Sequence, residues 1–178
     1  MRVVVITGAP GVGKTRLGHQ LVARYGVPAA AVDCDPVVYP WDGNESLYAL
    51  MAATVRASLP VYRDWGARVV VLSGVVLAGR AYEPLHRVFA DLGADPVYYG
   101  LRAAPEALAA RISGDPGGEH FVEGRLAERH LDEEVPGVPG IRLIDTTELT
   151  LAAATDAVAA AEFADLGPGW LPDPRVIS

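Results

Sequence analysis

The sequence predicts a single α/β domain in which helices cover both faces of a five-stranded parallel sheet. Short apolar runs alternate with longer amphipathic segments, as they do when right-handed helical crossovers join parallel strands. The chain has 178 residues, of which 51% are hydrophobic and 21% charged. This length and composition favour one folded core over disorder or several domains. We therefore expect residues 1–178 to form one domain.

Five apolar runs are predicted to be the strands: residues 2–6, 29–33, 68–73, 95–100 and 141–145. The first run leads straight into a glycine-rich loop. The third is nearly continuous in valine and leucine, which is typical of a central parallel strand covered on both faces.

The segments between these runs are predicted to be helices. One follows the glycine-rich loop, and the others span about 45 to beyond 59, 83–92, 106–112, 121–131 and 149–163. Pro60 is expected to kink or restart its helix, whereas Pro105 suits a first helical turn. Residues 113–119 have the composition of a flexible loop, and the tail, residues 165–178, that of irregular structure.

Charge and cysteine content exclude several classes of function. The formal net charge is −7, from 15 basic and 22 acidic residues, whereas nucleic acid and anionic membranes select a basic surface. The longest weakly interrupted apolar stretch, residues 69–78, is too short to span a bilayer. The single cysteine, Cys34, allows no internal disulfide and suits a reducing compartment. We expect a cytoplasmic protein, monomeric or homodimeric, without nucleic-acid or membrane partners.

The glycine-rich loop carries the most specific motif. Residues 8–15, GAPGVGKT, match G-x-x-x-x-G-K-[ST] in full, and Lys14 is the only lysine of the chain. Glycines let the backbone form a concave nest of N–H groups around phosphate oxygens, and the following helix adds its positive dipole end. Lys14 is expected to reach the β- and γ-phosphates and Thr15 to bind Mg²⁺, which predicts ATP and Mg²⁺ as cofactors. The predicted nucleotide-binding residues of this segment are Gly8, Ala9, Pro10, Gly11, Val12, Gly13, Lys14, Thr15 and Arg16.

Two aspartates follow at the end of the second predicted strand. Asp33 and Asp35 lie at a carboxyl strand end, the edge where sites form in parallel sheets. A carboxylate there can face the γ-phosphate and accept the proton of an attacking hydroxyl, so Asp33 is the favoured general base. For Asp35 a local role is equally well supported, because Asp-Pro starts turns.

Arginines flank a loop that is predicted to close over the nucleotide. Arg111 precedes it, and Arg125 and Arg129 follow it, four residues apart on one predicted helix. Such arginines spread cationic charge over a transferring phosphoryl group when a lid closes and excludes water. We expect a lid over residues 113–130, with Arg125 catalytic together with Lys14, and Arg111 and Arg129 binding the nucleotide. The alternative is that Arg125 and Arg129 only pair with acids on an exposed helix: Glu128, Asp132 and Glu133.

The acceptor site is the least specified part of the prediction. We call the carboxyl edge of the predicted sheet, where the glycine-rich loop lies, the mouth of the site. The polar and aromatic side chains that could reach it are Asp33, Asp35, Tyr39, Trp41, Asp42, Tyr62, Trp65, Arg80 and Glu83. Of these, the predicted acceptor-binding residues are Asp33, Asp35, Tyr39, Trp41 and Arg80. Aromatic walls suit a ring-bearing or sugar-like acceptor, although most of the aromatics could be core residues, the interpretation we prefer for Trp65.

A nucleoside monophosphate acceptor ranks second. Its phosphate needs several arginines, and only Arg80 and Arg56 are at hand. A hydroxyl of an antibiotic, another metabolite or a nucleoside therefore ranks first.

Several segments resemble the small P-loop kinases, the group of chloramphenicol phosphotransferase, gluconate kinase and shikimate kinase. Residues 32–34, with Pro40 seven positions after Asp33, resemble the second-strand segment of the chloramphenicol phosphotransferases, where that aspartate is the proposed base. Residues 66–71 resemble their third strand. Residues 145–147 are similar to the loop that lies against adenine, which implies that Thr147 binds the nucleotide. Residues 119–121 resemble the gluconate kinase lid.

The resemblance covers residue 3 to about residue 160. It implies a three-layer P-loop NTPase fold with strand order 2-3-1-4-5 and ATP-dependent phosphoryl transfer to an alcohol group. One departure concerns the third strand, which ends in Ser73-Gly74, where these kinases often carry an acid that holds a magnesium-bound water. Either Asp33 or Asp35 makes up this charge, or metal binding is weak without substrate.

The same residues bear on other nucleotide proteins. Motor and AAA-type ATPases need an acid at the end of the third strand beside a second carboxylate, and that acid is missing here. A GTPase needs an Asn-Lys-x-Asp motif to recognise guanine, which is impossible because Lys14 is the only lysine. The alternatives that remain are a nucleoside monophosphate kinase-like enzyme and a nucleotide-binding regulatory protein without kinase activity. The histidines show no metal-ligand spacing with Cys34, whose two acidic neighbours are expected to raise its pKa and leave it unreactive.

Overall fold

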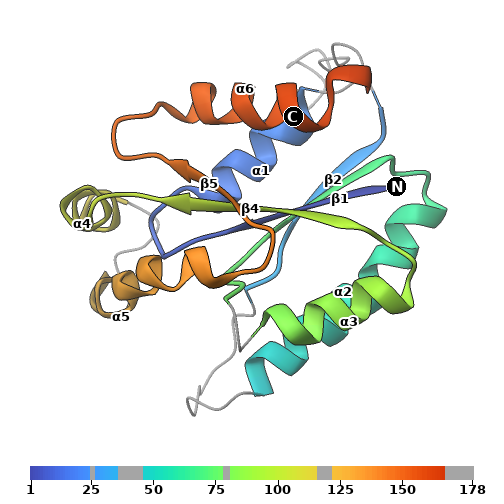
Figure 1. Cartoon of the computed structure of the whole chain (residues 1–178), viewed down its shortest axis with the longest axis horizontal. Helices are drawn as coiled ribbons and strands as arrows, with labels where there is room; N and C mark the ends of the chain where they lie inside the picture. The colour runs from blue at the N-terminus through green and yellow to red at the C-terminus, as the bar shows by residue number, and fades with distance from the viewer. Residues whose placement is uncertain (25–26, 36–45, 78–80, 116–121, 167–178) are drawn as a thin grey trace, which may run out of the picture.

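The computed structural model describes residues 1–24, 27–35, 46–77, 81–115 and 122–166. Within these residues, five strands form one parallel sheet with the order β2-β3-β1-β4-β5, as predicted (Figure 1). The strands are β1 Arg2–Thr7, β2 Ala29–Asp33, β3 Val69–Ser73, β4 Pro96–Arg102 and β5 Arg142–Asp145.

Burial follows position in the sheet. All five residues of β3 are buried, whereas the edge strands β2 and β5 are only partly covered. This agrees with the apolar run that marked the third strand as central.

Helices cover both faces of the sheet, which gives the three layers that were predicted. α1 and α6 lie on one face, and α2 and α3 on the other; α4 and α5 lie near the carboxyl ends of the strands (Figure 1). The α-helices are α1 Lys14–Ala23, α2 Ser46–Asp64, α3 Tyr82–Asp91, α4 Pro105–Ser113, α5 Val122–Ala127 and α6 Leu151–Glu162; the 3₁₀ helices are η2 Glu128–Glu133, η3 Val135–Gly137 and η4 Ala164–Leu166. No helix among the described residues is long and apolar enough to cross a membrane.

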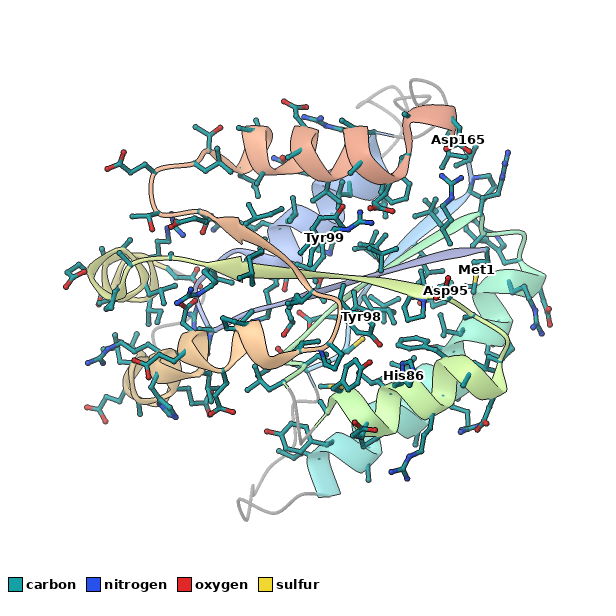
Figure 2. All side chains as sticks on the ribbon, viewed as in Figure 1. Met1, His86, Asp95, Tyr98, Tyr99 and Asp165 are labelled. Atoms are coloured by element: carbon teal, nitrogen blue, oxygen red, sulfur yellow. The ribbon has the colours of Figure 1, made fainter. Side chains whose placement is uncertain are left out.

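The hydrophobic core lies on both sides of the sheet. Neighbouring residues of β4 show this, since their side chains point to opposite faces (Figure 2). The ring of Tyr98 lies 5.4 Å from that of Tyr82 in α3, and the hydroxyl of Tyr99 donates a 2.7 Å hydrogen bond to Glu162 Oε1 in α6. The period-two alternation of a strand thus places one tyrosine in each half of the core.

Strand register brings three polar residues to one edge. Ile6 pairs with Ser73, and Asp33 pairs with the same serine from the other side. Thr7 ends β1, where its buried hydroxyl accepts from Val76 N and donates to Val76 O, both at 2.8 Å. This edge carries the glycine-rich loop.

Two helices differ from their predictions. α2 does not restart at Pro60 but continues to Asp64, because its buried residues Met51, Val55 and Leu59 pack on the core and outweigh the backbone hydrogen bond that proline removes. The helix predicted over 121–131 is α only to Ala127 and then tightens into η2.

Candidate functional site

The glycine-rich loop has the backbone conformation that the motif predicts. Gly11 and Gly13 have φ values of 82° and 102°, a region that side chains disfavour. A Cβ on Gly11 would also lie 2.6 Å from Ile112 Cγ1 of α4. Helix α1 then begins at Lys14 without a side-chain cap or an acidic residue in its first turn. Its first N–H groups thus have the character of an anion-binding terminus.

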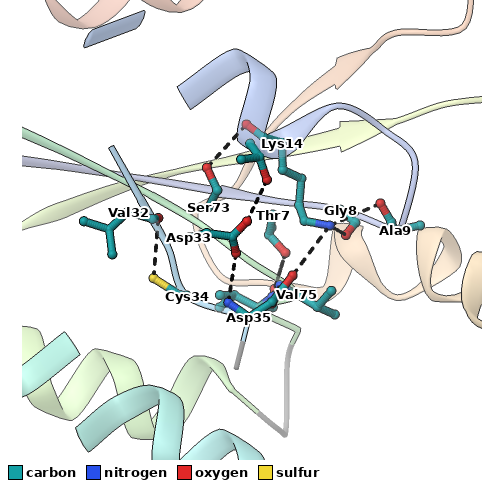
Figure 3. A network of polar contacts seen from close by, with 12 residues as sticks. Thr7, Gly8, Ala9, Lys14, Val32, Asp33, Cys34, Asp35, Ser73 and Val75 are labelled. Atoms are coloured by element: carbon teal, nitrogen blue, oxygen red, sulfur yellow. Dashed lines mark hydrogen bonds and ion pairs between the residues drawn. The ribbon is translucent and has the colours of Figure 1, made fainter. Parts of the chain in front are cut away.

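Lys14 is buried against the loop that precedes it. Its side chain is 9% exposed, and Nζ donates to Gly8 O at 3.0 Å and Ala9 O at 3.3 Å (Figure 3). Burial lowers the pKa of the ammonium, while the Asp35 and Asp33 carboxylates oppose the shift. The cation is therefore held by two loop carbonyls and the nearby Asp35 carboxylate, at the place where phosphates are expected.

The two aspartates face different partners. Thr15 Oγ1 donates to Asp33 Oδ2 at 2.8 Å, and Asp33 Oδ1 accepts from Asp35 N at 3.1 Å (Figure 3). Asp35 instead accepts from Val75 N at 2.6 Å, and its Oδ2 lies 4.0 Å from Lys14 Nζ. Asp33 therefore faces α1 and closes an Asx turn by accepting from Asp35 N, whereas Asp35 faces the end of β3.

Burial raises the pKa of the Asp35 carboxyl, and the Lys14 ammonium and the Val75 N–H oppose this. Its charge therefore depends on these two partners. Asp33 is exposed, so its carboxylate is open to a ligand.

Ser73 takes no part in the mouth. It is 2% exposed, and its Oγ donates to Lys14 O at 3.3 Å. The serine thus holds the first turn of α1 against β3, and the missing acid of the third strand is not replaced by its hydroxyl.

The oxygen donors at the mouth fit a magnesium ion. The Thr15 hydroxyl is a hard oxygen ligand of the kind that Mg²⁺ prefers, and the Asp33 carboxylate, 2.8 Å from it, adds negative charge beside the ion. Such an ion is held largely by nucleotide phosphates and water. Among the described residues there is no group of three or more His, Cys, Asp or Glu side chains that could hold a metal ion by themselves.

The lid arginines differ in what they contact. Arg125 Nη1 donates to Asp115 Oδ2 at 2.9 Å, and its charge lies close enough to lower the pKa of Lys14. Arg129 is exposed and donates to Leu126 O at 2.8 Å. The expectation that Arg125 and Arg129 share one α-helical face is wrong, because α5 ends between them.

Arg111 and Thr147 meet at the end of β5. Arg111 donates to the hydroxyl of Thr146 at 3.1 Å and to the backbone carbonyls of Thr146 and Thr147. Thr147 Oγ1 accepts from Ala104 N at 2.9 Å. The two predicted nucleotide contacts therefore lie side by side and tie the β5–α6 connection to α4.

A pocket beside this point could not be placed from the sequence, although two of its lining residues, Arg129 and Thr147, were predicted to bind the nucleotide. It encloses about 710 Å³ between α4, the lid segment and the end of β5. Asp132 lies in its wall, paired through Oδ2 with Arg102 Nε at 3.0 Å, while its buried Oδ1 has no hydrogen-bond partner among the described residues. Arg129 and Thr147 also line the pocket. It forms only when β4, η2 and β5 come together, and no local pattern encodes that.

Much of the predicted acceptor site lies outside the described residues, namely Tyr39, Trp41, Asp42 and Arg80. The same holds for residues 116–121 of the predicted lid. Two other candidates lie at the wrong edge. Tyr62 and Trp65 are at the end of α2, just before β3 begins, whereas the mouth is where β3 ends. Trp65 is 64% exposed, so the expectation of a core position is also wrong.

Arg56 is likewise remote from the mouth. Its guanidinium pairs with Asp91 at 2.6 Å, and Asp91 is the last residue of α3, just before β4 begins. It is therefore unsuited to hold an acceptor phosphate at the carboxyl edge. Arg16, on the first turn of α1, is exposed, as is Glu83 at the start of α3.

Cys34 is buried, and burial, with smaller contributions from Asp35 and Asp33, raises its pKa to about 12. The direction agrees with the sequence-based expectation, but burial outweighs the two acids. His86 stacks on Tyr82 with ring centroids 5.3 Å apart, which supports a structural role.

Comparison with known proteins places the fold. No family model and no curated protein matches the chain. Solved structures match over nearly the whole chain. The tunicamycin resistance protein of Deinococcus radiodurans has a TM-score of 0.61 at 16% identity and covers 96% of this chain and 99% of its own. The fold is that of the small P-loop kinases.

Two further solved structures support this assignment. A gluconokinase from Sinorhizobium meliloti has a TM-score of 0.58 at 16% identity, covering 90% of this chain and 94% of its own. A shikimate kinase from Bacteroides thetaiotaomicron has a TM-score of 0.54 at 16% identity, covering 90% and 97%. At such identities the likeness establishes the fold, and function has to be argued from the site.

Proposed function

We propose that the chain is an ATP- and Mg²⁺-dependent kinase that transfers the γ-phosphoryl group to a hydroxyl of a small molecule. The observation that carries the proposal is the convergence of Lys14, Thr15 and Asp33 at one strand edge, with Thr15 Oγ1 2.8 Å from Asp33 Oδ2. A phosphate-binding lysine, a metal-binding hydroxyl and an exposed carboxylate are the parts that phosphoryl transfer needs. The kinase-like solved structures support the same class.

Each residue has a distinct task in this proposal. The loop N–H groups and Lys14 bind the phosphates, and Arg125 adds positive charge from the lid side. Mg²⁺ held beside Thr15 and Asp33 would neutralise charge on the phosphates. Asp33 accepts the proton of the acceptor hydroxyl while the hydroxyl oxygen forms a bond to the γ-phosphorus. The bond from that phosphorus to the β–γ bridging oxygen breaks, and ADP is released.

A hydroxyl compound is favoured over a nucleoside monophosphate. The monophosphate would need arginines at the acceptor side, and Arg56 is instead paired with Asp91 at the opposite edge. The acceptor class we propose is a metabolite, nucleoside or antibiotic hydroxyl. Three of the similar structures are named for tunicamycin resistance, gluconokinase and shikimate kinase activity, and this guides the choice of compounds.

The test is ATP consumption against a panel of hydroxyl acceptors: nucleosides, hexoses and gluconate, shikimate, aminoglycosides, chloramphenicol and tunicamycin. Mass spectrometry follows any product that is heavier by one phosphoryl group. A phosphorylated product establishes the class and names the acceptor. Tight ATP binding without turnover of any compound would favour the alternative, a nucleotide-binding regulatory protein without kinase activity.

A further inference from the structure

The end of β3 has no acid of its own, but the space in front of it is filled. Gly74 follows β3, and its N–H donates to Ile6 O at 3.1 Å. A Cβ built on Gly74 would lie 2.9 Å from Asp35 Oδ1 and 3.3 Å from Cys34 Cβ. Gly74 is not among the glycines with positive φ. The glycine is therefore needed for room, and the group that takes the room is the carboxylate of Asp35.

Asp35 is fixed in this place from two sides. Val75 N donates to Oδ1 at 2.6 Å, and Lys14 Nζ lies 4.0 Å from Oδ2 (Figure 3). The carboxylate thus links β2, the β3–α3 connection and the phosphate-binding lysine. Asp33 does not share this position, because its carboxylate faces Thr15 on α1.

A negative charge at this point has a consequence for nucleotide binding. Phosphates that approach Lys14 come close to the Asp35 carboxylate. Without a metal the two anionic groups repel each other, and a bound cation removes that repulsion. A carboxylate beside the lysine therefore favours the metal-bound nucleotide over the metal-free one.

We propose that Asp35 is a positioning residue that replaces, from the segment just after β2, the acid absent from the end of β3, and that its charge makes nucleotide binding depend on Mg²⁺. The inference rests on the proposed nucleotide site at the glycine-rich loop. It assigns Asp35 to the metal and phosphate side of the mouth, in place of the acceptor-binding role that the sequence suggested.

The experiment measures the dissociation constant of ATP by calorimetry, once with Mg²⁺ and once with EDTA, without any acceptor. The quantity compared between variants is the ratio of the constant in EDTA to the constant in Mg²⁺. Asp35→Asn removes the charge, while its amide oxygen can still accept from Val75 N. We expect tighter metal-free binding, weaker Mg²⁺-dependent binding, and a ratio that falls about tenfold or more for one charge removed at this range. Glu123→Gln, at an exposed acid of α5, is the charge-matched control and is expected to keep the wild-type ratio.

A swap of positions provides the decisive variant. Asp35→Gly combined with Gly74→Asp moves the carboxylate onto the end of β3, into the space that Asp35 leaves, and is expected to restore most of the ratio. Gly74→Asp alone puts a second carboxylate against the first and is expected to destabilise the fold in thermal melts.

The outcomes separate this inference from the proposed function. A folded Asp35→Asn variant with the wild-type ratio would overturn the role of Asp35 and leave the kinase proposal intact. Wild-type protein that binds no ATP under either condition would overturn both. A ratio lost in Asp35→Asn and regained in the swap supports the inference even if no acceptor has been found.

Discussion

The two sides of the mouth are built in different ways. On the glycine-loop side, polar side chains from separate elements bond directly to one another, as Thr15 of α1 does to Asp33 of β2. On the lid side, Arg125 and Arg129 bond to residues close in the sequence: Arg125 to Asp115 and Arg129 to a carbonyl of the preceding turn. The first side is fixed by strand register, and the second by local contacts.

This difference has a consequence for energetics. Lys14 is already buried at the place where the phosphates are expected. Arg125, by contrast, has to exchange Asp115 for a phosphate, and the lost ion pair offsets part of the gain. We therefore expect substitutions on the glycine-loop side to have larger effects than substitutions in the lid.

The largest effect is expected for Lys14→Ala. It removes the only phosphate-facing lysine, so ATP affinity should fall about 10- to 10²-fold, the range for a lost hydrogen bond to a charged group, and turnover about 10³-fold. Calorimetry and steady-state kinetics measure the two. Near-normal turnover would contradict the whole assignment of the mouth. The variant does not separate a kinase from a nucleotide-binding regulator, because both need Lys14.

Asp33→Asn makes that separation. If Asp33 is the general base, turnover should fall at least ~10²-fold while ATP affinity stays close to that of the wild type. Steady-state kinetics with the acceptor found in the panel, together with ATP calorimetry, provides the comparison. Unchanged turnover would remove Asp33 from the mechanism, and its bond to Thr15 would then be purely structural.

The lid is tested by a matched pair, Arg125→Met and Arg129→Met. Arg125 lies close enough to Lys14 to affect its pKa, whereas Arg129 is exposed and contacts only a backbone carbonyl among the described residues. Turnover at saturating ATP should fall about tenfold or more for Arg125→Met, and less than about threefold for Arg129→Met. Equal losses of turnover would indicate that both guanidiniums contact the phosphates, and would contradict the expected difference between Arg125 and Arg129.

The sequence predicted the glycine-loop side well because its determinants are local. A strand, a glycine-rich turn and a helix are contiguous in residues 2–23, and parallel register then brings Asp33 beside Thr15. On the lid side, the extent of the helix was harder to predict. That α5 would end at Ala127 was not readable from the four-residue spacing of Arg125 and Arg129, because the same sequence is compatible with a longer helix.

Two aromatic candidates for the acceptor site were misplaced. Tyr62 and Trp65 were candidates for walls of the mouth, although a core position was preferred for Trp65; their position at the end of α2 puts both at the opposite edge of the sheet. Placement depends on which end of a parallel strand a helix leads into, a matter of chain direction rather than of residue type. The division of work between Asp33 and Asp35 also needed the structure, since their different contacts distinguish them: Thr15 bonds to Asp33 and Val75 to Asp35.

The smallest effect of a substitution is expected on the reactivity of Cys34, which lies between the two aspartates. With a folded-state pKa of about 12, only about 10⁻⁴ of the thiol is thiolate at pH 8, against roughly a quarter for a free cysteine. Iodoacetamide labelling followed by mass spectrometry should therefore be slow in the native protein and about 10³-fold faster in urea. Asp35→Asn should change the native rate only slightly, because burial is the larger cause of the shift. Rapid labelling of the native protein would show that the chain at the end of β2 opens readily. The glycine-loop side of the mouth would then be no more rigid than the lid side.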